Sequence, residues 1–126
     1  MFCLRWLRIG DDDPILCILP EYLEKILEGD KDLEIRDKPS HKHKGRRIWL
    51  AGSGTKTVYG HTILSYSMGP LSEDQWSELR ERHHVQGPRM YGSKTYAHVL
   101  RDVCRVDPIP IERKWGCIGF QTGPWA

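Results

Sequence analysis

The chain has 126 residues, of which 39% are hydrophobic and 29% charged, and its formal net charge is +2. This length and balance predict one folded domain with a modest core, which we place at residues 14–126 after an N-terminal extension at 1–13. No apolar run approaches the length of a membrane span, and the N-terminus lacks the apolar core and cleavage site of a secretory signal. The sequence therefore predicts an intracellular protein of the cytoplasm or nucleus without a membrane partner.

The first part of the domain predicts a strand, a helix and a second strand. ILCIL at 15–19 is a short apolar run typical of a buried strand. PEYLEKILEG at 20–29 begins with a proline, which the first turn of a helix tolerates, and ends with a glycine, a common helix stop. DLEIR at 32–36 predicts the next strand, and a polar loop follows at 37–45.

The middle of the chain predicts two strands and a helix. RRIWLAGS at 46–53 reads as a strand that ends in a glycine-rich turn. The segment 57–69 is rich in β-branched and aromatic residues and predicts a long strand, in which Gly60 marks a bulge. The segment 71–84 predicts the clearest helix, with Ser72 as its N-terminal cap.

The C-terminal part predicts a loop at 85–94, a bent strand at 95–106, a proline-held crossover at 107–114 and a last strand at 115–121. About six strands with two inserted helices predict an α+β fold, a small and mostly antiparallel β-barrel. Loops converge at the mouth of such a barrel, which is a common place for a ligand.

The cysteines and histidines do not form a metal-binding pattern. The sequence has four cysteines and no C-x-x-C pair, and the apolar surroundings of Cys17 and Cys117 predict reduced, buried thiols. The histidine pairs lack the helical spacing of zinc ligands. We expect neither a metal nor a cofactor.

The segment GDKDLEIRD at 29–37 concentrates opposite charges in a predicted strand. Side chains alternate along a strand, so Glu34 and Arg36 share one face while Leu33 and Ile35 share the other. Lys31 can join the charged pair only from the strand entrance or through a bulge. The segment is either a ligand-binding cleft or a surface ion-pair network that contributes little energy.

A basic cluster follows this strand. It consists of Lys38, Lys42, Lys44, Arg46 and Arg47, with His41 and His43 among them. Such a cluster can attract phosphates or an acidic protein partner, and it can equally be a solvated loop.

The order of these segments resembles an ASCH domain of the PUA-like superfamily. Members carry an apolar strand, a helix ending in glycine and a G-x-K-x-x-E-x-R segment, which here reads Gly29, Lys31, Glu34 and Arg36. YAHVL, PIPIERK and WGCIGF resemble the closing part of such domains, so the resemblance covers roughly residues 14–121. It implies a PUA-like barrel with a cleft beside the second strand, and binding of RNA or of a modified nucleobase.

Aromatic and glycine-flanked residues complete the predicted interface. Tyr91, Tyr96 and Trp115 lie beside loops with lysines, where bases of single-stranded nucleic acid could stack. Ser53 lies in a glycine-rich turn whose backbone could approach a phosphate. The predicted binding residues are Lys31, Glu34, Arg36, Lys38, Arg46, Ser53, Tyr96, Lys114 and Trp115.

An enzyme is the alternative, either a metal-independent ribonuclease or a nucleoside-modifying hydrolase. Some ASCH-like proteins resemble amidohydrolases on acylated cytidine that use a lysine, a threonine nucleophile and a glutamate. Here Lys31 matches, but Glu34 occupies the nucleophile position and 57–69 contains no acidic residue. The candidates for proton transfer in a ribonuclease are Lys31, Lys38, Ser53, Tyr96 and His98. Their spacing does not compel catalysis, so no catalytic residue is assigned.

Overall fold

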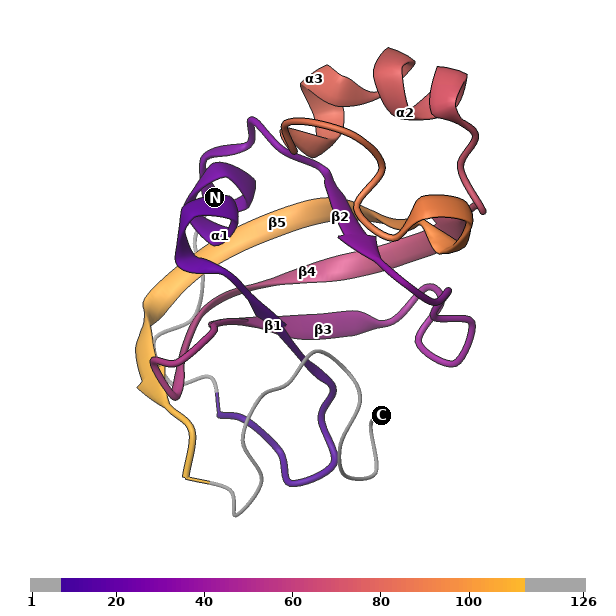
Figure 1. Ribbon diagram of the computed structural model, residues 1–126. Coiled ribbons are helices and arrows are strands. Elements are labelled where there is room, and N and C mark those ends of the chain that lie inside the picture. The colour runs from indigo at the N-terminus through magenta and orange to yellow at the C-terminus, as the bar shows by residue number, and fades with distance from the viewer. Residues whose placement is uncertain (1–7, 113–126) are drawn as a thin grey trace.

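The structure is a computed structural model that describes residues 8–112 (Figure 1). Its elements in chain order are β1 (Ile15–Ile18), α1 (Pro20–Glu28), β2 (Leu33–Arg36), β3 (Arg47–Gly52), β4 (Thr57–Met68), α2 (Glu73–Glu78), α3 (Arg80–His83), the 3₁₀ helix η1 (Gly92–Lys94) and β5 (Tyr96–Pro110). Helices interrupt the strands twice, between β1 and β2 and between β4 and β5.

The strands form one strongly curled sheet in the order β1-β3-β4-β5-β2. β1 runs parallel to β3, and the other neighbouring pairs are antiparallel. The α+β class and the mostly antiparallel sheet are therefore confirmed. The predicted barrel of about six strands is confirmed in part: the described residues form a half-barrel of five strands, in which β1 and β2 are the edges and do not pair with each other. The predicted strand at 115–121 lies outside the described residues.

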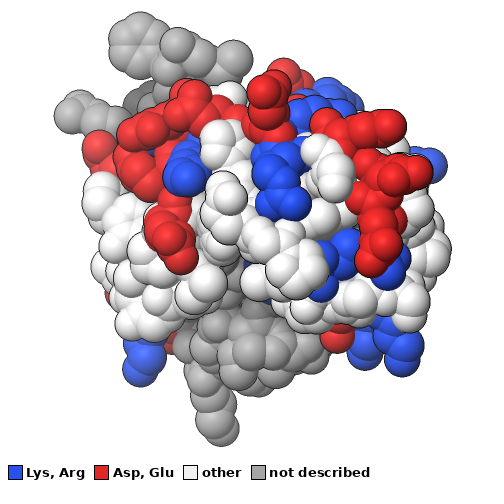
Figure 2. Space-filling model, turned by 45° about the horizontal axis from the view of Figure 1, so that its top comes forward, with Lys and Arg blue, Asp and Glu red and all other residues white. Residues whose placement is uncertain are grey.

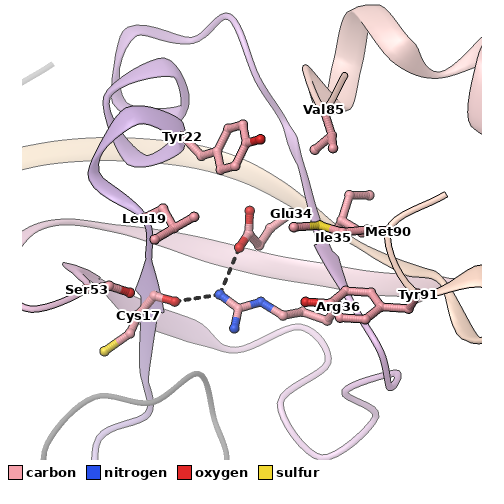
Figure 3. Close-up of a pocket in the computed structure, with 10 residues that line it drawn as sticks. All are labelled: Cys17, Leu19, Tyr22, Glu34, Ile35, Arg36, Ser53, Val85, Met90 and Tyr91. Carbon is pink, nitrogen blue, oxygen red and sulfur yellow. Dashed lines mark hydrogen bonds and ion pairs between the residues drawn. The ribbon is translucent and has the colours of Figure 1, made fainter. Parts of the chain in front are cut away.

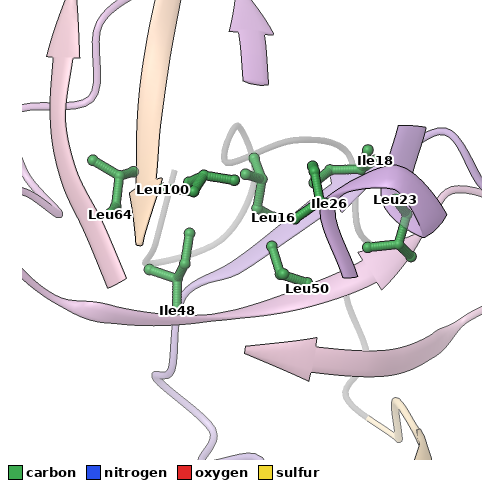
Figure 4. Packing of buried hydrophobic residues seen from close by; sticks show 8 residues of the cluster. All are labelled: Leu16, Ile18, Leu23, Ile26, Ile48, Leu50, Leu64 and Leu100. Atoms are coloured by element: carbon green, nitrogen blue, oxygen red, sulfur yellow. The ribbon is translucent and has the colours of Figure 1, made fainter. Parts of the chain in front are cut away.

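The concave face of the sheet and helix α1 enclose the main hydrophobic core (Figure 4). The strands contribute alternate residues to it, since successive side chains point to opposite faces. Helix α1 adds Leu23 and Ile26, which lie three residues apart and so share one side of the helix. The cluster consists of Leu16, Ile18, Leu23, Ile26, Ile48, Leu50, Leu64 and Leu100.

Local sequence accounts for α1 as predicted. Pro20 occupies the first turn, where its missing N–H removes no helical hydrogen bond. Gly29 ends the helix in the left-handed conformation with φ 90°, and its N–H donates to the carbonyl oxygen of Ile26 at 3.0 Å. The predicted irregularity in β4 is also confirmed, because the register with β5 shifts between Val58 and Gly60.

The predicted helix at 71–84 is shorter and divided. Ser72 caps α2 in a reciprocal capping box with Gln75. The helix is interrupted at Leu79, whose φ of −94° and ψ of 6° depart from helical values, and α3 follows directly.

The last described strand is longer than predicted. β5 continues through 107–110, so the predicted crossover at 107–114 is wrong in its first half. At this end β5 pairs with β4 but not with β2, which meets only residues 96–99. Because one edge of β5 is unpaired there, Pro108 and Pro110 need not remove a sheet hydrogen bond.

Cys17 is buried, as its apolar surroundings predict, and Cys104 is buried as well. Neither forms a disulfide within the described residues, and Cys3 and Cys117 lie outside them. None of the helices at 8–112 is both long and apolar enough to cross a bilayer.

Candidate functional site

One arginine side chain bridges the two edges of the curled sheet (Figure 3). Arg36 ends β2, and its Nη2 atom donates to the carbonyl oxygen of Cys17 on β1 at 2.5 Å and to Oε2 of Glu34 at 2.8 Å. Glu34 and Arg36 share one face of β2, as their spacing predicts. The guanidinium therefore occupies the place where backbone pairing between the edge strands is missing.

Lys31 lies at the entrance of β2 and reaches the same charged pair. Its Nζ is 3.7 Å from Oε1 of Glu34 and donates to the carbonyl oxygens of Leu33, at 2.6 Å, and of His83. The ammonium also lies 4.9 Å from the centre of the Tyr22 ring. Burial lowers the pKa of Lys31, and the Glu34 carboxylate opposes this shift. The sequence left two ways for Lys31 to reach the charged pair, a position at the strand entrance or a bulge. In the structure it lies at the strand entrance.

A pocket of about 120 Å³ opens beside the Arg36–Glu34 pair (Figure 3). Its walls come from β1, α1, β2, the turn after β3 and the loop after α3. The lining residues are Cys17, Leu19, Tyr22, Glu34, Ile35, Arg36, Ser53, Val85, Met90 and Tyr91. The volume is well below the roughly 300–1,000 Å³ of sites for drug-sized ligands, so the pocket suits one small planar group.

One donor of Arg36 has no partner among the described residues. The Nε–H group is buried and makes no hydrogen bond within residues 8–112. An unsatisfied buried donor costs about 1–3 kcal/mol. The Arg36 side chain as a whole lines the pocket and is 23% exposed, whereas that of Glu34 is 8% exposed.

The pocket rim is apolar and aromatic. Leu19, Met90 and Tyr91 are 49%, 45% and 40% exposed, and they are among the few large hydrophobic side chains on the described surface. A charged floor below an exposed apolar rim is the arrangement expected for an aromatic ring that also carries polar edge groups.

Charge is distributed unevenly over the surface. On the face that carries the helices, acidic side chains gather at both sides, with basic ones between them (Figure 2). The loop at 37–46 begins directly after Arg36 and carries four exposed cations. They are Lys38, Lys42, Lys44 and Arg46, two of which, Lys38 and Arg46, are predicted binding residues outside the pocket lining.

The remaining predicted residues have different surroundings. Ser53 lines the pocket. Tyr96 pairs with Arg36 across β2 and β5 and is half-buried, but it does not belong to the pocket lining. Lys114 and Trp115 lie outside the described residues. Within 8–112 there is no group of three or more His, Cys, Asp or Glu side chains that could hold a metal.

Much of the pocket wall was not predicted from the sequence. Tyr22 lies next to the core residue Leu23 on α1, so its ring falls at the flank of the buried side and turns toward β2. An aromatic residue at the margin of an amphipathic face is the signal that could have identified it. Met90 and Tyr91 come from a loop far along the chain, and nothing local indicates that they meet β2.

A buried histidine lies beside the charged pair. His98 on β5 is the cross-strand partner of Glu34, and its Nδ1 is 2.8 Å from Oγ of Ser67. The same hydroxyl oxygen accepts the N–H of Ser40 at 2.9 Å. This network ties the start of the loop at 37–46 to the sheet.

The pKa of His98 predicts a loss of stability in mild acid. Burial, followed by the charges of Arg36 and His43, lowers it from 6.5 to about 3. Between these values the unfolded chain binds a proton that the folded chain does not, so stability falls as the pH falls. From pH 7 to pH 5, wild type should lose about 2 kcal/mol more than a His98→Gln variant in urea unfolding. Equal losses would contradict a neutral, buried imidazole.

Comparison of three-dimensional structures relates this architecture to solved proteins. The crystal structure of ASCH from Zymomonas mobilis superposes with a TM-score of 0.68 at 22% identity, over 82% of this chain and 76% of that one. Two point mutants of the Zymomonas mobilis protein match with TM-scores of 0.67 and 0.68 at 23% and 22% identity, over 81% and 80% of this chain and 76% and 77% of theirs. This chain has the ASCH fold. A scan of family models and a search of curated proteins each found no match.

The ASCH fold confirms the structural part of the sequence resemblance. The G-x-K-x-x-E-x-R segment runs from the end of α1 into β2, so its charged residues lie at one edge of the half-barrel. At 22–23% identity the likeness concerns the fold. The function rests on the geometry of the site itself.

Proposed function

We propose that this ASCH-fold protein binds single-stranded RNA, with one base, ordinary or modified, in the Arg36–Glu34 pocket. The observation that supports the proposal is the set of hydrogen bonds made by the Arg36 guanidinium. Glu34 and the Cys17 carbonyl hold the guanidinium in place through one nitrogen, while its buried Nε–H lacks a partner among the described residues. A guanidinium held in this way is ready to donate to a carbonyl or phosphate oxygen.

The pocket chemistry suits a nucleobase. Oε2 of Glu34 is bound by Arg36, and Oε1 is 3.7 Å from Lys31, so the carboxylate retains capacity to accept a base amino or imino proton. Tyr91 on the rim can stack on the ring, as aromatic side chains do on unpaired bases. The small volume admits one ring system at a time.

The loop at 37–46 supplies the backbone contacts in this proposal. Its exposed lysines and arginine follow Arg36 directly, so an RNA strand with a base in the pocket would have phosphates near them. Binding should therefore weaken as salt increases, with a slope of about 0.7 per phosphate contact in a log–log plot.

The pocket favours binding over hydrolysis. The ammonium of Lys31 already donates to two backbone carbonyls and is fully buried. The imidazole of His98 does not line the pocket. Burial, with the charges of Glu21 and Glu34, raises the pKa of Tyr22 and makes its phenol a poor base.

A titration of labelled single-stranded RNA tests the site. Arg36→Gln should weaken binding by about tenfold to a hundredfold, because hydrogen bonds from a charged group contribute about 1.5–3 kcal/mol. The matched control is Arg105→Gln, which removes another ion-paired arginine, 2.8 Å from Glu24, outside the pocket lining. Tyr91→Ala, at an exposed position, should weaken binding through lost stacking without affecting the fold.

The same samples then go onto a denaturing gel. Arg36→Gln and Tyr91→Ala proteins that both bind like wild type would overturn the pocket assignment. RNA shortened by wild type alone would make the protein a ribonuclease and replace the binding proposal.

A further inference from the structure

A row of basic residues crosses the outer face of the sheet, on the side opposite the main core. Arg47 on β3 pairs with Ile63 on β4, which pairs with Arg101 on β5. We call Arg47, Ile63 and Arg101, with His61 beside them, the outer strip. The two arginines are two strand spacings apart, roughly 10 Å.

The strip is exposed between two covered parts of the outer face. Arg47, Ile63 and Arg101 each have a sequence neighbour in the main core, so alternation directs these three side chains outward. The neighbours are Ile48, Leu64 and Leu100. On one side of it lies the apolar cluster around Trp49, and on the other the cluster of α2 with β2 and β5. Arg47 and Arg101 are both exposed.

Neighbouring groups orient Arg47. Its Nη1 lies 2.6 Å from Nδ1 of His61 and 3.3 Å from the carbonyl oxygen of Asp102. Burial, followed by the charge of Arg47, lowers the pKa of His61, which keeps the ring neutral and able to accept this hydrogen bond. Arg47 is exposed, and the two contacts above involve only Nη1, so the guanidinium has further donors for a ligand.

A backbone irregularity places Arg101 beside this guanidinium. The register between β4 and β5 shifts between His61 and Ile63, and Asp102 adopts the left-handed conformation with φ 52°. Arg101 pairs with the Asp102 carboxylate at 2.9 Å. Within residues 8–112, Asp102 is the acidic residue that contacts the two arginines, and it partly neutralises the strip.

We propose that the outer strip is a second contact surface for the backbone of the same RNA strand. Arg47 and Arg101 bind phosphates there and continue the line of cations that the loop at 37–46 begins, since Arg47 follows Arg46 directly. Arginine suits this role because its planar donors match phosphate oxygens. The proposal rests on RNA binding as proposed above and adds a path for the strand beyond the pocket.

Oligonucleotide length separates the strip from the pocket. Wild type, Arg36→Gln and an Arg47→Gln/Arg101→Gln double variant are titrated with RNAs of about four and about sixteen nucleotides at several salt concentrations. The double variant should bind the short RNA like wild type. With the long RNA it should bind at least about tenfold more weakly, and the slope of log K against log salt should be shallower by about 1.4, for two lost phosphate contacts. The control Arg105→Gln should change neither.

A substitution that is expected to strengthen binding controls for damage to the fold. Asp102→Asn removes the acidic group from the strip, and asparagine tolerates the left-handed backbone. It should strengthen binding of the long RNA severalfold and leave the short RNA unchanged.

The outcomes distinguish the two proposals. If the double variant binds the long RNA like wild type while Arg36→Gln loses both RNAs, the strip proposal alone is wrong. If Arg36→Gln binds both RNAs like wild type while the double variant loses only the long one, the pocket proposal alone is wrong. Wild type that binds neither RNA would overturn both.

Discussion

Replacing Lys31 by methionine is expected to lower the free energy of unfolding by about 3 kcal/mol, although methionine nearly matches the lysine stem in shape. Lys31 is 1% exposed, and its ammonium donates to the carbonyl oxygens of Leu33 and His83. Methionine offers no donor to these buried oxygens. It also removes the cation from the Tyr22 ring and from Oε1 of Glu34.

The loss should also loosen one wall of the pocket. Lys31 connects the entrance of β2 to the end of α3, and the loop after α3 carries Val85, Met90 and Tyr91. In the variant, local opening of 83–91 no longer has to break the hydrogen bond to the His83 carbonyl. We therefore expect faster amide hydrogen exchange in this segment.

Urea unfolding and hydrogen exchange check this prediction. Lys94→Met is the matched control, since Lys94 is exposed and the change should stay within about 0.5 kcal/mol. If the free energy of unfolding of Lys31→Met lies within about 1 kcal/mol of the wild-type value, the prediction is wrong. The cost of burying the charge would then be about equal to the stabilisation from its contacts.

Replacing Gly60 by alanine is expected to destabilise the protein by about 3 kcal/mol, at the upper end for overpacked cores. A Cβ at this position would lie 2.5 Å from the carbonyl oxygen of Cys104 and 2.6 Å from Cδ2 of Leu27. The first neighbour is backbone of β5 and moves only if the β4–β5 pairing opens. The second is the end of the Leu27 side chain on α1, which can change rotamer, so the backbone contact accounts for most of the expected cost.

Gly52→Ala is the control, since its nearest contacts are side-chain atoms of Thr55 at 3.2 Å, which can shift. Thermal unfolding of both variants tests this prediction. Equal unfolding midpoints would mean that the sheet accommodates a methyl group at Gly60 without loss of stability.

Local sequence by itself determined the elements whose signals are short-range. Helix α1 follows from Pro20, Gly29 and the spacing of Leu23 and Ile26, all within ten residues. The β-branched and aromatic residues of 57–69 likewise predicted β4. Alternation of side chains along β2 placed Glu34 and Arg36 on a common face. These features depend on backbone geometry with periods of two and 3.6 residues, which a sequence displays directly.

Where local signals conflict, the prediction of an element was wrong. Prolines at 108 and 110 predicted a crossover, but β5 continues through both of them. Nothing in the sequence indicated that the described sheet is a half-barrel, in which the side chain of Arg36 reaches from edge strand β2 to edge strand β1.

Only the tertiary structure decided how the site is assembled. The pocket joins residues from Cys17 to Tyr91, and the burial of Lys31 depends on a carbonyl 52 positions later in the chain. Such contacts arise because the sheet curls and α3 packs against β2. Local sequence patterns do not show which distant residues will come into contact. The sequence by itself therefore determined which charged groups the site contains, and the packing of distant segments decided which are buried, which are paired and which face a ligand.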